Sequence, residues 1–325
     1  MNYDKIGLEI KEELMIYIAN HLPFVIKGSF LTSQYHSNPY ARLLNGGDID
    51  LIYNDQNSNI FTPEKFDWDS YHQFIRGVEK LLRNELIDIF YKLEEIMTRK
   101  LNLSARPLFI LELEELGYDK IFRDSRTIGL FLVNYAADGD FTTVGLEIYD
   151  CQMCIEIDVA IDLPLHFQPE TILYKSMEGK ETLLKNATPL LYQTAWKMHQ
   201  ILVRPRLKDL DDMIHFLPHI DFKEKNNFQI FFDEIISECK LTDIHTCRGL
   251  IATLKMVFLK EDAIRSSIVK KMVELGNETK YYSDLYCVHS TEKLKNKVCV
   301  SFLNKLQNSI DCEAALEYIG KHGGI

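Results

Sequence analysis

The stretch GSFLTSQYHSNPYARLLNGGDIDLIYN, residues 28–54, carries the pattern that decides the fold of this chain. It follows the segment Phe24–Lys27, whose apolar residues predict a short buried strand that ends at Gly28. Ser29 is a preferred N-cap residue, so we expect it to cap a helix that continues through Tyr35. A glycine at a strand end, followed by a helix N-terminus, exposes backbone N–H groups that can bind an anion.

The second half of the stretch predicts a loop and then a second strand. Asn-Pro and Gly-Gly pairs within 36–47 are typical of loops, and Asp48–Tyr53 has the residues of a strand. Asp48 and Asp50 are two residues apart, so on a strand both side chains project from the same face. Two such carboxylates repel each other unless a cation lies between them. The pattern therefore fits either an ordinary surface hairpin or a site for a metal ion and a triphosphate.

The composition of the chain is that of a folded globular protein. Its 325 residues are 46% hydrophobic and 26% charged, which suits one large domain or two ordinary ones. The sequence has no run of eighteen uncharged apolar residues and no secretory-signal pattern at its N-terminus, so we expect a cytoplasmic protein with no membrane partner. Seven cysteines, an odd number, do not predict a disulfide framework. The net charge of −11 argues mildly against a nucleic-acid partner.

The character of the chain changes near its middle. In the first half the periodicity and the β-branched and aromatic residues predict helices over 5–21 and 68–100 and strands over 127–136, 142–149 and 151–161. After Pro164 the pattern is almost wholly helical, and Thr188 followed by Pro189 predicts a helix start. We therefore expect an α+β fold, with an α/β domain over 1–170 and a helical domain over 171–325.

One later strand supplies a candidate third carboxylate. The segment IEIDVAI, residues 155–161, alternates well, with Asp158 flanked by apolar residues on both sides. A carboxylate on a strand next to the acidic pair would complete a two-metal site for phosphoryl transfer, and Mg²⁺ prefers such hard oxygen ligands. Asp158 is the best candidate for that position, and Glu156, on the same face, is the reserve.

At this point the residues resemble a known family. Gly28-Ser29, Asp48-Ile49-Asp50 and Ile157-Asp158-Val159 together resemble the nucleotidyltransferase fold of the DNA polymerase β type. A further segment narrows the resemblance. Trp196-Lys197, then Arg204, then Lys208-Asp209-Leu210-Asp211-Asp212 is similar to the K…R…KDxxD segment of AbiEii/AbiGii toxin-type nucleotidyltransferases. The resemblance covers about residues 24–217 through motifs, and the last hundred residues match only in being helical.

The resemblance implies a role for each matched residue, with the helical domain completing the active-site cleft. Gly28 and Ser29 would contact the nucleotide phosphates, and Asp48, Asp50 and Asp158 would bind two Mg²⁺ ions, with Asp158 also deprotonating the acceptor hydroxyl. Lys208 would neutralise the charge of the triphosphate, and Asp209 and Asp212 would orient that lysine or close the site. Lys197 and Arg204 would support the nucleotide or the acceptor.

The implied activity is transfer of a nucleoside monophosphate from an NTP to an acceptor hydroxyl, with release of pyrophosphate. The resemblance favours an RNA acceptor such as a tRNA 3′ end, a place in a toxin–antitoxin or phage-defence system, and a cognate antitoxin as partner. The acidic charge keeps a small-molecule acceptor open, as in antibiotic adenylyltransferases, and a protein hydroxyl is conceivable. A non-catalytic nucleotide-binding or interaction protein is the other class, and the intact carboxylates argue against it.

Two features depart from the family pattern. The span between Ser29 and Asp48 is longer than the usual spacing, which implies an inserted loop at 36–46 that shapes access to the nucleotide. The family commonly has Arg-x-Thr directly before the acidic pair, whereas this chain has Gly46-Gly47 there and Arg42 is too far away to replace the arginine.

The charged segment 208–212 also has a simpler interpretation. On a helix Lys208 and Asp212 are four residues apart and lie on one face, so an ordinary surface ion pair would explain them. Among the neighbouring residues we expect Trp196 in the core and His199 on the surface. His215 and the other histidines show no metal-ligand pattern in the sequence.

Overall fold

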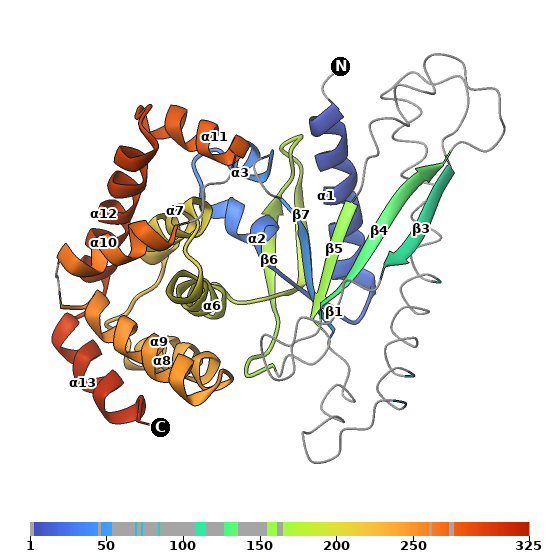
Figure 1. Ribbon diagram of the computed structural model, residues 1–325. Helices are drawn as coiled ribbons and strands as arrows, with labels where there is room; N and C mark the ends of the chain where they lie inside the picture. Colours follow the sequence, from blue (N-terminus) through green and yellow to red (C-terminus); the bar gives the residue numbers. More distant parts are fainter. Residues whose placement is uncertain are drawn as a thin grey trace. The chain divides into compact units, whose positions relative to one another are not determined.

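The computed structural model describes residues 3–44, 47–53, 69, 73, 84, 108–114, 127–135, 155–160, 165–259, 262–272 and 276–324. The chain folds into two compact units (Figure 1). The sheet unit comprises Met1–Gln34, Gly47–Lys120 and Asp124–Thr188. The helical unit comprises Tyr35–Gly46, Ile121–Arg123 and Pro189–Ile325. The expected α+β class is therefore confirmed.

The sheet unit contains a seven-stranded mixed sheet among its described residues, in the order β3-β4-β5-β2-β1-β7-β6. The strands are β1 (Phe24–Lys27), β2 (Ile49–Tyr53), β3 (Leu108–Glu114), β4 (Thr127–Tyr135), β5 (Ile155–Ala160), β6 (Glu170–Lys175) and β7 (Glu181–Ala187). Strand β1 pairs antiparallel with β2 and parallel with β7, and β2 pairs parallel with β5. The remaining pairs are antiparallel.

Central strands β1 and β2 are buried because their residues are apolar almost without interruption, as in strands covered on both faces. Phe24, Val25 and Ile26 of β1 are fully buried. Helix α1 (Tyr3–His21) packs against β1 and β7 and buries its apolar stripe, including Ile10 and Leu14. The predicted helix over 5–21 and the predicted strands at 24–27 and 48–53 are thus confirmed.

The segment between β1 and β2 differs from the expectation in two ways. Gly28, rather than Ser29, is the N-cap, and the expected helix is one α-helical turn, α2 (Ser29–Thr32), followed by a 3₁₀ turn, η1 (Ser33–Tyr35). A loop was expected over 36–47, but Pro39–Leu44 within this range forms helix α3, so the expectation is wrong there. Proline is favoured at the first position of a helix, and the Asn38 side chain accepts a hydrogen bond from the Ala41 N–H, so this stretch contains a capped helix start.

Strands β6 and β7 lie in the range that we expected to be helical. They form an antiparallel hairpin that extends the sheet next to β1. Each strand alternates an exposed leucine, Leu173 or Leu183, with a buried neighbour, Tyr174 or Leu184, which is the period-two pattern of a strand with one buried face. The division between the two units therefore falls after Thr188 rather than near residue 170. Strand β3 was also missed, whereas β4 and β5 confirm the predicted strands over 127–136 and 155–161.

The helical unit confirms the helical expectation for the described residues after 189. Its helices after α3 are α6 (Leu190–Val203), α7 (Leu207–Phe216), the 3₁₀ turn η2 (Leu217–His219), α8 (Lys225–Lys240), α9 (Ile244–Val257), α10 (Asp262–Lys271), α11 (Gly276–Tyr286), α12 (Thr291–Ser309) and α13 (Cys312–His322). They enclose one contiguous apolar core that includes Met198, Met213, Phe232 and Phe302. Pro189 is the N-cap of α6, one residue after the expected cap.

Several expectations fall on residues outside the described ranges. The predicted helices over 68–100 are described only at residues 69, 73 and 84, which are helical. The predicted strands over 142–149 and 151–154 lie outside the described residues. None of the described helices is long and apolar enough to cross a membrane.

His199, expected on the surface, is buried on α6 with 6% of its surface exposed. Its Nδ1 atom lies 3.9 Å from Glu238 Oε2. Burial lowers the pKa of His199 to about 4, because desolvation disfavours the charged imidazole. The folded protein therefore holds this histidine neutral at a pH where the unfolded chain protonates it.

The sign of the pH dependence follows from that difference. Between about pH 6.5 and pH 4 the unfolded state binds one more proton at His199, so the free energy of unfolding falls by up to about 3 kcal/mol as the pH drops through this window. We expect His199→Gln to lose less stability than the wild type between pH 7 and pH 4.5, measured by urea unfolding. Equal pH dependence of the wild type and His199→Gln would contradict the prediction.

Candidate functional site

The acidic pair lies at the start of a central strand of the sheet unit. Asp50 is the second residue of β2, and Asp48 immediately precedes the strand. The parallel register of β2 and β5 pairs Asp50 with Asp158. Neighbouring strands lie about 4.8 Å apart, so the backbone places the third predicted acidic residue directly beside the second.

Gly28 is required by both its backbone conformation and its neighbour. Its φ of 74° and ψ of −150° lie in a region that is essentially restricted to glycine. A Cβ atom at this position would lie 1.9 Å from Asp50 Oδ2. The carboxylate of Asp50 therefore occupies the space that a side chain at position 28 would need, which joins the two predicted motifs in one place.

Substitution of Gly28 by alanine tests this contact. We expect Gly28→Ala to cost about 1–3 kcal/mol in the free energy of unfolding from backbone strain alone and also to displace the Asp50 carboxylate. Gly179 is a matched control, since its φ is +78° but a Cβ there would meet nothing within 4 Å. Gly179→Ala should show the strain without any change in metal affinity. Urea unfolding and Mn²⁺ titration of both variants separate the two effects, and unchanged Mn²⁺ affinity in Gly28→Ala would contradict the role given to the contact.

Ser29 links the glycine turn to the acidic strand. Its hydroxyl donates to the Asp48 carbonyl and accepts from the Asp48 N–H, both at 3.1 Å. Its expected contact with phosphate stays a prediction, because the hydroxyl is engaged with the backbone here. The observed bonds hold Asp48 at a fixed distance from the turn.

Two lysines that the sequence reasoning missed lie beside the acidic pair. Lys11 Nζ donates to the Gly47 carbonyl at 2.9 Å and lies 3.6 Å from Asp48 Oδ1. Lys27 Nζ lies 3.5 Å from Asp50 Oδ1. Lys27 and Asp50 are cross-strand partners in the antiparallel register of β1 and β2. Pairing the two predicted strands as a hairpin would therefore have placed this lysine opposite Asp50.

The other predicted residues belong to the helical unit, where Asp212 is the centre of a buried ion cluster. Its side chain has no exposed surface. Arg42 binds it with two hydrogen bonds, Nε to Oδ1 at 2.7 Å and Nη2 to Oδ2 at 2.8 Å, and His36 Nε2 lies 2.9 Å from Oδ1. Burial by itself raises the pKa of Asp212, but the charges of Arg42 and Lys197 outweigh it and hold the pKa well below its ordinary value.

Asp209 is the second buried carboxylate of this cluster. Lys197 Nζ donates to Asp209 Oδ1 at 2.9 Å and lies 3.3 Å from Asp212 Oδ2. Arg206 donates to both oxygens of Asp209, at 2.6 and 3.0 Å. Burial opposes ionisation of Asp209, yet the charges of Lys197 and Arg206 lower its pKa. Lys197, in turn, has its pKa raised, because the two carboxylates outweigh its desolvation.

The structure thus brings Lys197, Asp209 and Asp212 together. Asp212 is fully buried, so the simpler interpretation of a surface ion pair is wrong for this residue. Arg204 is exposed and Lys208 is half-buried, while Arg206 makes the contact with Asp209. The sequence reasoning missed His36, Arg42 and Arg206. The first two lie about 170 residues from their partner, and no local pattern could have connected them.

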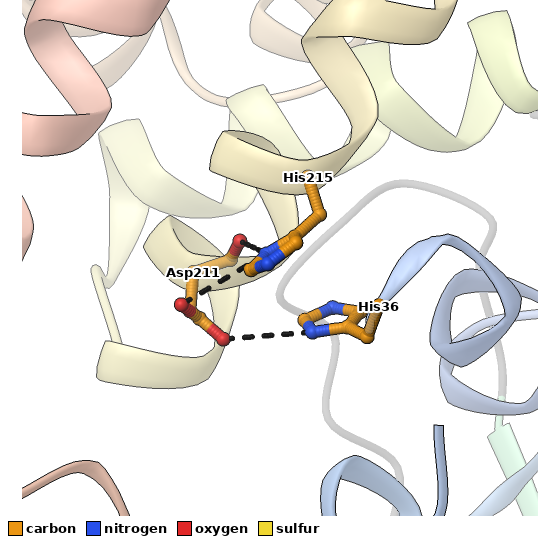
Figure 2. Close-up of side chains that lie close together, drawn as sticks. All are labelled: His36, Asp211 and His215. Atoms are coloured by element: carbon orange, nitrogen blue, oxygen red, sulfur yellow. Dashed lines mark hydrogen bonds and ion pairs between the residues drawn. The ribbon is translucent and has the colours of Figure 1, made fainter. Parts of the chain in front are cut away.

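Metal binding by Asp48, Asp50 and Asp158 stays a prediction, supported by the backbone register of Asp50 and Asp158. One group of described side chains meets the distances of a metal site. In the helical unit, one ligand atom each from His36, Asp211 and His215 lies within 4.8 Å of the other two (Figure 2).

The chain was compared with protein-family models, curated proteins and solved structures, and none of them matches it.

Proposed function

We propose that the protein is a metal-dependent nucleotidyltransferase whose acidic centre is formed by Asp48, Asp50 and Asp158. The observation that carries the proposal is the arrangement around Asp50, which lies against Gly28 and is paired with Asp158 across parallel strands. A surface hairpin needs neither a glycine-only turn packed on a carboxylate nor a second acidic residue in register on the neighbouring parallel strand. An acidic centre for metal and triphosphate uses both.

The acidic centre fits Mg²⁺ because carboxylate oxygens are its preferred protein ligands. Lys11 and Lys27 neutralise the pair in the absence of metal. The side chains of Asp48 and Asp50 are 40% and 25% exposed, and their lysine nitrogens lie 3.6 and 3.5 Å away, so both ion pairs are long and open to solvent in part. A divalent cation would replace the lysines beside the carboxylates, and the lysines would then be free to neutralise the phosphates of the nucleotide.

The proposed reaction is an in-line displacement at phosphorus. The acceptor hydroxyl oxygen forms a bond to the α-phosphorus of the NTP, the bond from that phosphorus to the bridging oxygen breaks, and pyrophosphate leaves. Asp158 receives the proton of the hydroxyl. Mg²⁺, when bound, supplies positive charge to the attacking and leaving oxygens. The contribution of the protein is mainly positioning and electrostatic stabilisation.

Two classes of acceptor hydroxyl are proposed, one on RNA and one on a small molecule. The resemblance of the motifs favours an RNA acceptor such as a tRNA 3′ end, in a toxin controlled by an antitoxin. The net charge of −11 keeps a small-molecule hydroxyl open as the alternative. The catalytic and binding roles of Lys197, Arg204, Lys208, Asp209 and Asp212 stay predictions.

Label transfer distinguishes these acceptors. The purified chain is incubated with Mg²⁺ and each α-labelled NTP, together with total RNA or with a small-molecule extract, and the labelled product is separated by size. Label in tRNA would support the RNA-modifying activity, and label in small molecules would support the alternative. Transfer to neither pool by correctly folded protein would count against both.

A further inference from the structure

The helical unit contains a cluster of two histidines and one aspartate, all within that unit. His36 follows η1, and Asp211 and His215 are one turn apart on α7. His36 Nδ1 lies 3.7 Å from Asp211 Oδ2, and the two imidazole rings stack with centroids 4.1 Å apart (Figure 2). One ligand atom of each of the three side chains therefore faces the same small region of the helical unit.

Each histidine has one ring nitrogen fixed by an acceptor. His36 Nε2 lies 2.9 Å from Asp212 Oδ1, a carboxylate oxygen that also accepts from Arg42 Nε, so Nε2 is the donor in this contact. His215 Nδ1 lies 2.8 Å from the Asp211 carbonyl, which also can only accept. A lone pair on His36 Nδ1 is therefore available, whereas the His215 nitrogen beside the Asp211 carboxylate is Nδ1 itself, 4.0 Å from Oδ1, so metal binding by His215 requires its ring to turn. Outer hydrogen bonds of this kind are what orient histidine ligands in metal sites.

The aspartate between them is buried and only half satisfied. Asp211 has no exposed side-chain surface, and its Oδ1 accepts a hydrogen bond from the Tyr286 hydroxyl at 2.5 Å. Its Oδ2, which faces His36 Nδ1, is buried and lacks a hydrogen-bond partner. A buried carboxylate oxygen in this state is costly unless something supplies positive charge.

From this geometry we propose that His36, Asp211 and His215 form a binding site for a transition-metal ion of the zinc class. Two imidazole nitrogens and one carboxylate oxygen suit Zn²⁺ or Co²⁺ rather than Mg²⁺. Three protein ligands leave a fourth position open for water or another ligand. The site is independent of the proposed nucleotidyl transfer, which uses carboxylates of the other unit.

The distances between the candidate ligand atoms show how far the side chains must move to bind a zinc ion. Tetrahedral zinc with bonds of about 2.0–2.1 Å places its ligand atoms roughly 3.4 Å apart, and the 3.7 Å between His36 Nδ1 and Asp211 Oδ2 is already close to that. His215 must supply most of the remaining movement. Its side chain is 29% exposed, so its ring can turn and the ion can enter from that side.

Metal binding is tested on the full chain after dialysis against a chelator. Zn²⁺ affinity is measured by competition with a chromogenic chelator, and the ligand field is read from the visible absorption of the Co²⁺ form. His215→Ala removes a half-exposed ligand, Asp211→Asn weakens the central one, and Tyr286→Phe removes its outer hydrogen bond. His219→Ala removes an exposed histidine near the same end of the unit and is the matched control.

We expect one equivalent of Zn²⁺ per chain, with affinity reduced more than about 100-fold by His215→Ala and about 10-fold or more by Tyr286→Phe, and unchanged by His219→Ala. Zn²⁺ should also raise the thermal midpoint of the wild type and of His219→Ala but not of His215→Ala. Absence of tight Zn²⁺ binding by the folded wild type, or equal binding by the two histidine variants, would overturn the proposal. If Asp211→Asn does not fold, the half-exposed His215 still decides the result.

Discussion

Replacing Asp50 by asparagine is expected to lower metal-dependent nucleotidyl transfer by about 10³-fold or more while the protein stays folded. Asparagine keeps the shape of the side chain against Gly28 but removes the negative charge that holds the metal. Stabilisation of transition-state charge by a metal is worth several kcal/mol, and about 4 kcal/mol corresponds to roughly 10³-fold in rate. The measurement is the initial rate of pyrophosphate release at saturating NTP and Mg²⁺, with Mn²⁺ affinity as a second readout.

A matched charge change elsewhere in the sheet unit provides the control. Glu181 is exposed on β7, so Glu181→Gln should keep the rate within about twofold. If Asp50→Asn retained more than a tenth of the wild-type rate, or if Glu181→Gln lost as much, the role given to Asp50 would be contradicted.

Replacing Arg42 by methionine is expected to destabilise the helical unit by about 3–5 kcal/mol. Arg42 is 1% exposed and is bound bidentately to Asp212, which is completely buried. Removing one partner of a buried pair leaves an uncompensated charge in the interior, and that loss is large even where the pair itself adds little stability. Since domains are stable by only about 5–15 kcal/mol, the helical unit of the variant should unfold at much lower urea concentration, measured by circular dichroism.

The exposed Arg204 is the control for the lost charge. Arg204→Met should change the free energy of unfolding by no more than about 0.5 kcal/mol. Arg42→Lys should fall between the two variants, because an ammonium group cannot reproduce the two parallel hydrogen bonds to Asp212. Similar stabilities for Arg42→Met and Arg204→Met would show that the ion cluster does not hold the helical unit together.

Arg42 also changes the interpretation of the segment between the two motifs. The resemblance implied that residues 36–46 are an inserted loop that shapes access to the nucleotide, and deletion of such a loop should alter substrate choice before it alters folding. The segment instead carries His36 and Arg42 into the ion cluster of the helical unit. Its deletion should therefore destabilise that unit first.

The parts of the fold that sequence predicted are those fixed by local patterns. Helix α1 and strands β1 and β2 follow from apolar residues at helical spacing or in short uninterrupted runs. Strands β6 and β7 were missed because half of their residues are charged or polar and face solvent. Their assignment depends on pairing with β1, which is separated from β7 by more than 150 residues.

The same distinction explains what was predicted of the candidate site. The glycine turn and the acidic pair lie within about 20 residues, and Asp158 was recognised from the alternation of its own strand. The contacts of Arg42 and His36 with Asp212 span 170 and 176 residues. The His36, Asp211 and His215 group likewise depends on the fold of the helical unit, so their spacing in the sequence gave no sign of a metal site.

The most direct test of nucleotidyl transfer is pyrophosphate release by the purified wild-type chain. Each of the four NTPs is supplied in turn with total RNA and a small-molecule extract, with and without Mg²⁺. The proposed function predicts release from at least one NTP that requires Mg²⁺ and is lost in Asp50→Asn. No release from any NTP, by protein whose circular dichroism and cooperative melting show that it is folded, would contradict it.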